Sequence, residues 1–261
     1  MLKKRIIGSI AVLNGWAVQS ISYNRYLPLG KPEVIAQNLD RWGADEILIQ
    51  CIDRSKNSNG PDFSTLSKIA NAGITTPLIY AGGIKDNLDA INVIKYGADR
   101  VMFDALLNSD LAEITKSAQI LGSQALLGCI PVSFNQGKIY RFNYLTKTTE
   151  PLTNEYLEKI YSSSISELLL VDFLNEGLEK SFNFKILKSS KITNMKIPIL
   201  IFGGISTPGI ANKILKQENI AGVSIGNFLS YKENSIEYFK TAINNSSIRK
   251  HKFFTKGNHA K

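Results

Sequence analysis

Pro77-Leu-Ile-Tyr-Ala-Gly-Gly-Ile84 returns 121 positions later, nearly unchanged, as Pro198-Ile-Leu-Ile-Phe-Gly-Gly-Ile205. Each stretch is a short apolar run that ends in paired glycines. This is the pattern of a buried parallel strand whose carboxyl end must let another group approach the backbone. Two weaker pairs recur at nearly the same offset, 44–50 with 166–171 and 98–104 with 221–227. The chain is therefore predicted to be two fused copies of one half.

Predicted strands and helices alternate eight times along the 261 residues. The strand-like runs are 5–12, 46–51, 77–81, 100–104, 124–130, 167–171, 198–202 and 222–226. Stretches of helical period occupy 32–42, 63–72, 88–96, 111–121, 152–161, 184–192, 208–215 and 235–243. Eight alternations with a twofold repeat predict a single α/β domain, a (β/α)8 TIM barrel over 1–245, with half-barrels at about 1–122 and 123–245.

Two of the predicted strand-to-helix loops are long, 14–31 and 132–150, and they occupy equivalent places in the two halves. The second is predicted to be a hairpin, with Asn135-Gln-Gly137 as its turn and 138–143 as its return strand. Barrels of this kind keep their chemistry at the C-terminal face, where these loops lie. We therefore expect both loops to be lids or substrate walls.

The net charge of +9 is concentrated at one end of the chain. Residues 246–261 carry five lysines and arginines and no acidic residue, which leaves +4 for the rest. We interpret this segment as a flexible basic tail, and we expect no nucleic-acid partner. No apolar run reaches the roughly 18 residues that span a bilayer, so a cytoplasmic protein without membrane contact is predicted.

Six short motifs, each unspecific alone, stand in register over nearly the whole chain. They are Lys4-Arg5-Ile6-Ile7, Gly43-Ala44-Asp45-Glu46, Ala81-Gly82-Gly83-Ile84, Gly97-Ala98-Asp99-Arg100, Gly122-Ser123-Gln124-Ala125 and Gly203-Gly204-Ile205. With these motifs the sequence resembles the cyclase subunit of imidazole glycerol phosphate synthase. The resemblance implies a TIM barrel, a glutaminase-type amidotransferase subunit as partner and a phosphorylated small-molecule ligand.

The resemblance also implies two catalytic aspartates, at the ends of the first and fifth strands, which serve as general acid and base during ring closure. Ala11 and Pro131 stand at these positions. Neither side chain can exchange a proton, and 8–14 and 125–134 contain no Asp, Glu, His or Lys. Proton transfer typically contributes roughly 10²–10⁴-fold to a rate, so normal cyclase activity is not expected.

Four charges of the family pattern remain at the N-terminal end of the barrel. They are Arg5, Glu46, Arg100 and Glu167, with arginine in place of a family lysine at position 100. In the family, this ring gates a channel that carries ammonia from the glutaminase. Two interpretations stay open, because the charges could simply plug the barrel floor or could plug and gate it. Asp99 matches a family residue at the glutaminase contact.

The resemblance places a phosphate site in each half of the barrel. Backbone amides and polar side chains suit a phosphate dianion in the second half. The residues of that site are Gly203, Gly204, Ser206, Gly226 and Asn227. The first half offers Gly82 and Gly83, but Asp104 replaces a neutral family asparagine there. A carboxylate repels a phosphate, so we expect the second-half site to be the functional one.

Carboxyls at strand ends are the remaining candidates for acid–base chemistry. Asp172 and Glu176 are the catalytic candidates, and Glu176 replaces a family aspartate. Asp53 and Asp104 lie on the same predicted face, and solvated loop carboxylates are the alternative interpretation for each. Lys31 replaces an acidic family residue, so the substrate contacts of the first long loop are also altered.

Histidine and cysteine offer little chemistry. The two histidines, His251 and His259, fall in the tail, so we expect no catalytic triad, no metal site and no cofactor. Cys51 and Cys129 lie in predicted strands with no histidine to activate them, and we expect buried, unreactive thiols.

Three functions follow from these observations. The first is a divergent barrel that pairs with a glutaminase subunit and conducts ammonia for sugar amidation in surface polysaccharide biosynthesis, where an ATP-dependent sugar amidotransferase would use it. The second is a genuine cyclase of histidine biosynthesis. The third is a non-catalytic barrel that binds a phosphorylated ligand. The sequence favours the first, because the acid–base positions are lost and the floor charges are kept.

Overall fold

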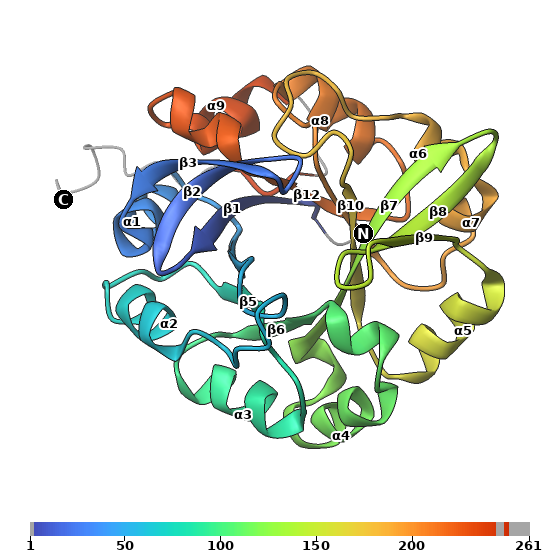
Figure 1. The fold of residues 1–261 in the computed structure, drawn as a ribbon. Helices are drawn as coiled ribbons and strands as arrows, with labels where there is room; N and C mark the ends of the chain where they lie inside the picture. Colours follow the sequence, from blue (N-terminus) through green and yellow to red (C-terminus); the bar gives the residue numbers. More distant parts are fainter. Residues whose placement is uncertain (1–2, 244–247, 251–261) are drawn as a thin grey trace, which may run out of the picture.

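A computed structural model of the protein describes residues 3–243 and 248–250. Eight parallel strands close into a barrel, with helices around the outside (Figure 1). The barrel strands are β1 (Arg5–Leu13), β4 (Glu46–Cys51), β5 (Leu78–Ala81), β6 (Arg100–Phe103), β7 (Leu126–Asn135), β10 (Glu167–Asp172), β11 (Ile199–Phe202) and β12 (Ile220–Ile225). Each strand pairs in parallel with the next, and β12 closes the ring on β1. The predicted TIM barrel is confirmed.

The helices follow the predicted pattern closely. They are α1 (Pro32–Arg41), α2 (Phe63–Ala70), α3 (Asn87–Lys95), α4 (Leu111–Leu121), α5 (Asn154–Ser162), α6 (Lys185–Lys188), α7 (Ser190–Thr193), α8 (Pro208–Leu215) and α9 (Ser235–Ala242). Short 3₁₀ turns form η1 (Ala105–Asn108), η2 (Ser123–Ala125) and η3 (Asn227–Tyr231). The single helix predicted over 184–192 is instead two, because Ser189 has an extended backbone. None of the described helices is long and apolar enough to cross a membrane.

Alternation along the strands creates two apolar layers. One side of each strand packs against the surrounding helices, as Ile6 and Ile10 do. The other side fills the barrel interior, where ten buried apolar side chains form what we call the inner cluster. They are Ile7, Leu48, Ile79, Ala81, Met102, Leu127, Leu169, Val171, Leu200 and Phe202.

Two antiparallel extensions rise from the C-terminal face of the barrel, one after β1 and one after β7 (Figure 1). The first is the hairpin of β2 (Trp16–Ile21) and β3 (Arg25–Gly30), and the second is formed by β8 (Lys138–Asn143) and β9 (Thr148–Pro151). The turn predicted for the second is confirmed, with positive φ at Gln136 and Gly137.

The first extension was expected only as a long loop, yet it begins with the same kind of turn. Asn14 and Gly15 have φ values of 50° and 76°, and they join β1 directly to β2. Asn-Gly is the preferred pair for this left-handed geometry, so the sequence carried a signal for the hairpin.

Lys4, just before β1, lies beside a segment from the far end of the sequence. Lys4 and Ile248 form a parallel bridge, and the Arg249 amide donates to the Lys4 carbonyl at 3.2 Å. Ile248 is 3% exposed, so this part of the predicted tail is packed rather than flexible. The remainder of the predicted tail, including both histidines, lies outside the described residues.

Candidate functional site

Four charged side chains, from β1, β4, β6 and β10, close the N-terminal end of the barrel. Arg5 lies between Glu46 and Glu167, with nitrogen–oxygen distances of 3.1 and 2.5 Å. Arg100 bridges the same two carboxylates at 3.2 and 2.8 Å. The four side chains are only 8–14% exposed. We call this closed arrangement the charged ring.

Each member of the charged ring depends on its neighbours. Burial lowers the pKa of the Arg5 guanidinium, but the carboxylates of Glu46 and Glu167 outweigh it, and the net shift is upward. Burial raises the pKa of the Glu46 carboxyl, although Arg5 and Arg100 oppose this shift. Removal of one partner from a buried ion pair is strongly destabilising. The ring is therefore stable as a complete set, and a plug and a gate would share this geometry.

An apolar layer follows the charged ring inside the barrel. Side chains two positions apart on a strand face the same side, so the residues two positions after the ring members also point inward. These are Ile7, Leu48, Met102 and Leu169, and each is 1% exposed. All four belong to the inner cluster. Along the barrel axis, the charged ring is therefore followed by a layer of apolar side chains, which lies before the C-terminal mouth.

Asp99, predicted to contact a partner, has a structural role in this chain. Its carboxylate accepts the Leu78 amide at 2.8 Å, at the start of β5. Asp45, in the earlier Gly-Ala-Asp motif, accepts the Ile6 amide at 2.8 Å in the same manner. The repeated motif therefore ties each strand start to its neighbour. Asp99 is exposed beside the charged ring, and its partner contact stays a prediction.

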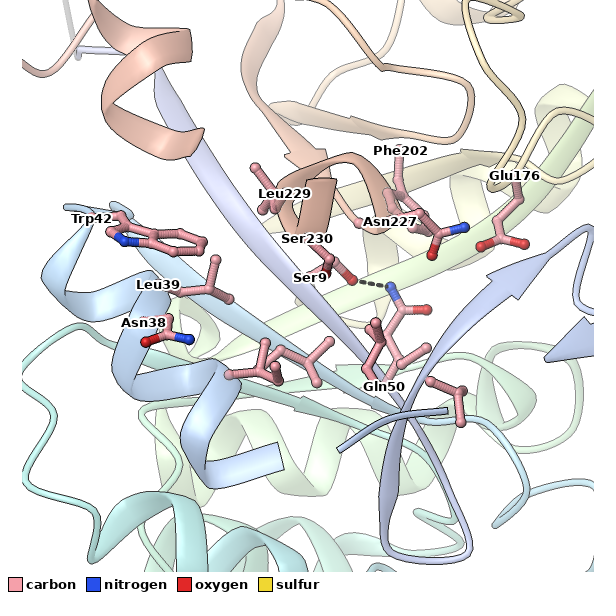
Figure 2. Close-up of a pocket in the computed structure, with 16 residues that line it drawn as sticks. Ser9, Asn38, Leu39, Trp42, Gln50, Glu176, Phe202, Asn227, Leu229 and Ser230 are labelled. Atoms are coloured by element: carbon pink, nitrogen blue, oxygen red, sulfur yellow. Dashed lines mark hydrogen bonds between the residues drawn. The ribbon is translucent and has the colours of Figure 1, made fainter. Parts of the chain in front are cut away.

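Two cavities occupy the C-terminal mouth. The larger, which we call the mouth cavity, measures about 400 Å³ and lies between the β2–β3 turn, the ends of β4 to β7 and the β8–β9 extension. The smaller, the side cavity, measures about 210 Å³ and lies between β1, β2, α1 and η3 (Figure 2). Gln50 lines both. Its side chain donates to Ser9 Oγ at 2.9 Å and accepts the Tyr23 hydroxyl at 3.1 Å.

The two positions that lack the expected aspartates face different cavities. Ala11 lines the side cavity and Pro131 lines the mouth cavity. Each cavity is also lined by a carboxyl, that of Glu176 in the side cavity and that of Asp104 in the mouth cavity. The mouth of the barrel therefore has one acid in each cavity, at places that differ from those of the family pattern.

Glu176 is buried and fastens the first hairpin to the barrel. Its Oε2 atom accepts the Ser20 hydroxyl and the Tyr23 amide, both at 3.0 Å, and its carbonyl accepts the Ser22 amide at 2.9 Å. Burial raises the pKa of the Glu176 carboxyl to about 7, against the effect of these hydrogen bonds. A carboxyl with such a pKa can give or take a proton near neutrality.

Asn227 fastens the same hairpin from η3. Its side chain accepts the Ser20 amide at 3.2 Å and donates to the Ser20 carbonyl at 2.6 Å. Figure 2 shows Asn227 and Glu176 on one side of the side cavity, with Leu39 of α1 and Trp42, which directly follows α1, on the other. We call Glu176 and Asn227 the hairpin clamp.

The hairpin clamp holds a strained turn. Ser22 and Tyr23 have φ values of 52° and 48°, a left-handed conformation that is unfavourable for side chains other than glycine, asparagine and aspartate. Residues in this region persist only where surrounding contacts enforce them. The contacts of Glu176 supply that enforcement and place the Tyr23 ring over the inner cluster.

The paired glycines of both halves are needed for strand packing. A Cβ atom at Gly82 would lie 2.2 Å from the Cys51 carbonyl oxygen, and one at Gly203 would lie 2.5 Å from the Asp172 carbonyl oxygen. Both glycines also have positive φ values, of 121° and 101°. The group that approaches each glycine is therefore the backbone of the preceding barrel strand.

The predicted second-half phosphate residues surround a narrow cleft. Gly203, Gly204, Gly226 and Asn227 line it together with Ser224, whose buried hydroxyl has no hydrogen-bond partner among the described residues. The cleft measures about 10 Å³, which suits a single water. A phosphate would need the loops to separate. Ser206 lies outside this lining, and its hydroxyl accepts the Lys180 amide at 2.8 Å.

The equivalent first-half site is organised around a carboxylate. The Gly83 amide donates to Ser55 Oγ at 2.9 Å, and Ser55 Oγ lies 3.5 Å from Asp104 Oδ1. The Tyr144 hydroxyl donates to Asp104 Oδ2 at 2.5 Å. Burial raises the pKa of the Asp104 carboxyl, and these hydrogen bonds oppose that shift. The amide that would have met a phosphate is therefore already engaged.

The other predicted carboxyls hold loops. Asp172 accepts the Asn175 side-chain amide at 2.9 Å and the Asn183 backbone amide at 2.8 Å. Asp53 accepts the Asn14 amide at 3.2 Å and supports the first hairpin turn. Neither lines the mouth cavity or the side cavity. Within residues 3–243 and 248–250, no three His, Cys, Asp or Glu side chains gather as metal ligands.

Both cysteines are free thiols. Cys51 is buried, and burial raises the pKa of its thiol to about 12. Cys129 is half-buried and lines the mouth cavity, and burial raises the pKa of its thiol as well. Because the thiolate is the reactive form, neither residue is activated as a nucleophile.

Comparison with known proteins shows similarity along nearly the whole chain. The model of a family described as "Histidine biosynthesis protein" matches residues 5–235. The imidazole glycerol phosphate synthase subunit HisF of an Exiguobacterium species is 28% identical over 242 residues, 92% of this chain and 93% of the relative. A Campylobacter jejuni protein named "Putative imidazole glycerol phosphate synthase subunit hisF2" is 31% identical over 242 residues, 91% of this chain and 95% of the relative.

Proposed function

This chain belongs to the histidine biosynthesis protein family, and we propose that it is a divergent, cyclase-like barrel that receives ammonia from a glutaminase subunit and conducts it to the C-terminal mouth. The observation that carries the proposal is a contrast within one barrel. The charged ring is complete at the floor, whereas Ala11 and Pro131 stand where the family pattern has its acid and base.

The barrel interior is suited to neutral ammonia. The inner cluster lies between the charged ring and the mouth cavity and consists of apolar side chains. An apolar passage disfavours ammonium, because a charge loses its hydration there without compensation. Three members of the inner cluster, Ala81, Met102 and Val171, also line the mouth cavity. A molecule that passed the charged ring would emerge in this cavity.

The partner and the acceptor follow from the family resemblance. The relatives are named as subunits of a synthase, which supports a complex in which a glutaminase-type subunit docks at the floor, near Asp99. The acceptor would be a sugar of surface polysaccharide biosynthesis, aminated with the help of an ATP-dependent sugar amidotransferase. In this scheme the barrel provides the passage and the amidotransferase provides the activation.

A cyclase assay with excess ammonium salt tests the loss of the original chemistry. Excess ammonia bypasses any glutaminase, so the assay measures what the barrel itself catalyses. We expect no turnover of the family substrate by the wild-type chain and measurable turnover by the double variant Ala11→Asp, Pro131→Asp. Substantial wild-type turnover would instead establish a genuine cyclase, with Glu176 and Asp104 as the first residues to substitute.

Charge-neutral substitution of the floor tests the passage. The variant Glu46→Gln, Glu167→Gln keeps the shape of the charged ring and removes its negative charge. With a glutaminase subunit added, we expect altered affinity for that subunit or altered glutamine hydrolysis. The matched control is Glu155→Gln, in an exposed pair with Lys159. The ammonia proposal fails if the floor variant matches the wild type in both measurements.

A phosphate-binding barrel without catalysis is the second candidate. The unpaired Ser224 hydroxyl in the second-half cleft favours it. Phosphate titration, followed by ³¹P line broadening, tests it with Ser224→Ala as the variant that should weaken binding.

A further inference from the structure

The mouth cavity has the character of a ligand site in its own right. Ligand pockets of about 300–1,000 Å³ lined by aromatic side chains and a few polar groups are typical of small-molecule binding. The cavity of about 400 Å³ falls in this range. Its aromatic walls are Tyr23, Tyr26, Phe142, Tyr144 and Phe173. Phe142 and Phe173 stack with their ring centroids 4.5 Å apart, which gives the cavity a flat apolar face.

The polar groups of the cavity are distributed by depth. Asp104 follows the end of β6 and is in contact with Ser55 and Tyr144, which also line the cavity. Lys56 and Lys147 line the same cavity and are exposed. The deep end therefore contains a carboxylate and the rim contains two ammonium groups.

Asp104 can accept a further hydrogen bond from a ligand. A carboxylate has about four lone-pair positions. Oδ1 is approached by the Ala105 amide and the Ser55 hydroxyl, whereas Oδ2 accepts the Tyr144 hydroxyl. A ligand hydroxyl or amino group at Oδ2 would satisfy the remaining capacity, and a phosphate or carboxylate at the same place would be repelled.

The preference of Asp104 for a hydroxyl or amino group over an anion has no counterpart in the second half of the repeat. Asp104 and Asn227 occupy equivalent positions of the repeat. Asn227 is neutral, and both ends of its side chain are engaged with the Ser20 backbone. Asp104 instead borders an open cavity. The same strand end thus holds a hairpin in one half and a charged acceptor in the other.

We propose that the mouth cavity binds a sugar acid, a hydroxylated ring with an anionic group, with a ring hydroxyl on Asp104 and the anionic group beside Lys56 and Lys147. Such a ring presents C–H faces to the stacked aromatic wall and hydroxyls at its edge to the polar side chains. The inference extends the proposed function, because it names the chemical class of the ammonia acceptor and places that acceptor where the inner cluster opens.

Binding is tested on the full chain alone, with D-glucuronate as the probe and D-glucose as its neutral analogue. We expect saturation-transfer NMR to detect glucuronate at millimolar concentration and glucose more weakly. Asp104→Asn should weaken glucuronate binding about tenfold, since it removes a charged hydrogen-bond acceptor. Inorganic phosphate should not displace glucuronate from the wild type. The control is Glu155→Gln, an exposed carboxyl that lines neither the mouth cavity nor the side cavity, and it should bind normally.

A second variant keeps the test decisive if Asp104→Asn does not fold. Lys56→Gln, Lys147→Gln changes only exposed side chains and should abolish the preference for glucuronate over glucose. The proposal is overturned if glucuronate does not bind, or if it binds Asp104→Asn as well as the wild type. Because no glutaminase is present, these results do not depend on ammonia transfer. A chain that binds glucuronate but fails the floor test would retain this site and lose only the proposed passage.

Discussion

The two ends of the barrel use charge in opposite ways. At the floor, the side chains of Arg5, Arg100, Glu46 and Glu167 pair with one another in a closed ring. Arg100 also donates to the Gln124 carbonyl and the Ser166 hydroxyl. At the mouth, the carboxyls are separated, and each accepts hydrogen bonds from loop backbone or neutral side chains. An arginine beside a carboxylate favours its ionised form and occupies its oxygen atoms, whereas a carboxyl without a charged partner has acceptor capacity left for a ligand.

This difference indicates which end of the barrel tolerates substitutions. The floor forms a set from which no member can be removed without leaving a buried charge. At the mouth, Ala11 and Pro131 each line a cavity whose carboxyl comes from another residue, Glu176 or Asp104. Four measurements test this difference between the floor and the mouth of the barrel.

The largest effect is expected at the floor. Arg5→Met leaves Glu46 and Glu167 with Arg100 as their one remaining partner, so the free energy of unfolding should fall by about 3 kcal/mol. Urea denaturation measures it. Lys159→Met, in an exposed ion pair with Glu155, is the control and should change the value by less than about 0.5 kcal/mol. Equal effects at the two sites would remove the contrast between floor and surface.

The next effect is a pH dependence at the mouth. Burial raises the pKa of Glu176 from 4.5 to about 7, so the folded state holds a proton that the unfolded state releases between these values. The stability contributed by this protonated carboxyl is present at low pH and is lost as pH rises toward 7. Wild-type unfolding free energy should therefore decline relative to that of Glu176→Gln, by about 2 kcal/mol between pH 5 and pH 7. If the unfolding free energies of the wild type and of Glu176→Gln change in the same way with pH, the pKa of Glu176 is not raised.

A smaller effect is expected where the first hairpin meets the barrel interior. Tyr23→Phe removes the 3.1 Å hydrogen bond to Gln50 and keeps the ring over the inner cluster. The loss of unfolding free energy should be about 1 kcal/mol. Loss of a much larger amount would mean that the hydroxyl, rather than the hairpin clamp, holds the strained turn.

The smallest effect on stability is expected for Asp99→Asn. An asparagine oxygen can still accept a hydrogen bond from the Leu78 amide. The free energy of unfolding, measured by thermal denaturation, should therefore change by less than about 0.5 kcal/mol. Affinity for a glutaminase subunit should nevertheless fall, if the exposed charge is part of the docking surface. An unchanged affinity would leave Asp99 with its strand-binding role alone.

The barrel could be predicted from sequence because its signals are local and repeated. The stretches 77–84 and 198–205 each predicted a strand whose paired glycines let another group approach, and apolar runs located the other six strands. The β2–β3 hairpin was missed although Asn14-Gly15 is a turn signal, because the stretch after it lacks strict alternation of apolar and polar residues.

The candidate site was harder to predict, because it depends on contacts between distant loops. Glu176 and Asn227 were predicted as an acid and a phosphate ligand, yet both contact Ser20, more than 150 positions away in sequence. Asp104 was predicted as an obstacle to phosphate and as one of the carboxyls on the C-terminal face. The return strand 138–143 was predicted, but the hydrogen bond from Tyr144 to Asp104 was not, because these residues are 40 positions apart in the sequence.

The bridge between Lys4 and Ile248 has a consequence for how this chain could be rebuilt. In a chain trimmed to 4–248, a short linker between these two residues would make the backbone circular. A new opening at exposed Gly122 would then begin the chain with its second half. Proteins whose ends lie close together tolerate such permutation. A permuted chain that folds would show that the order in which the two halves are synthesised is irrelevant to the finished ring.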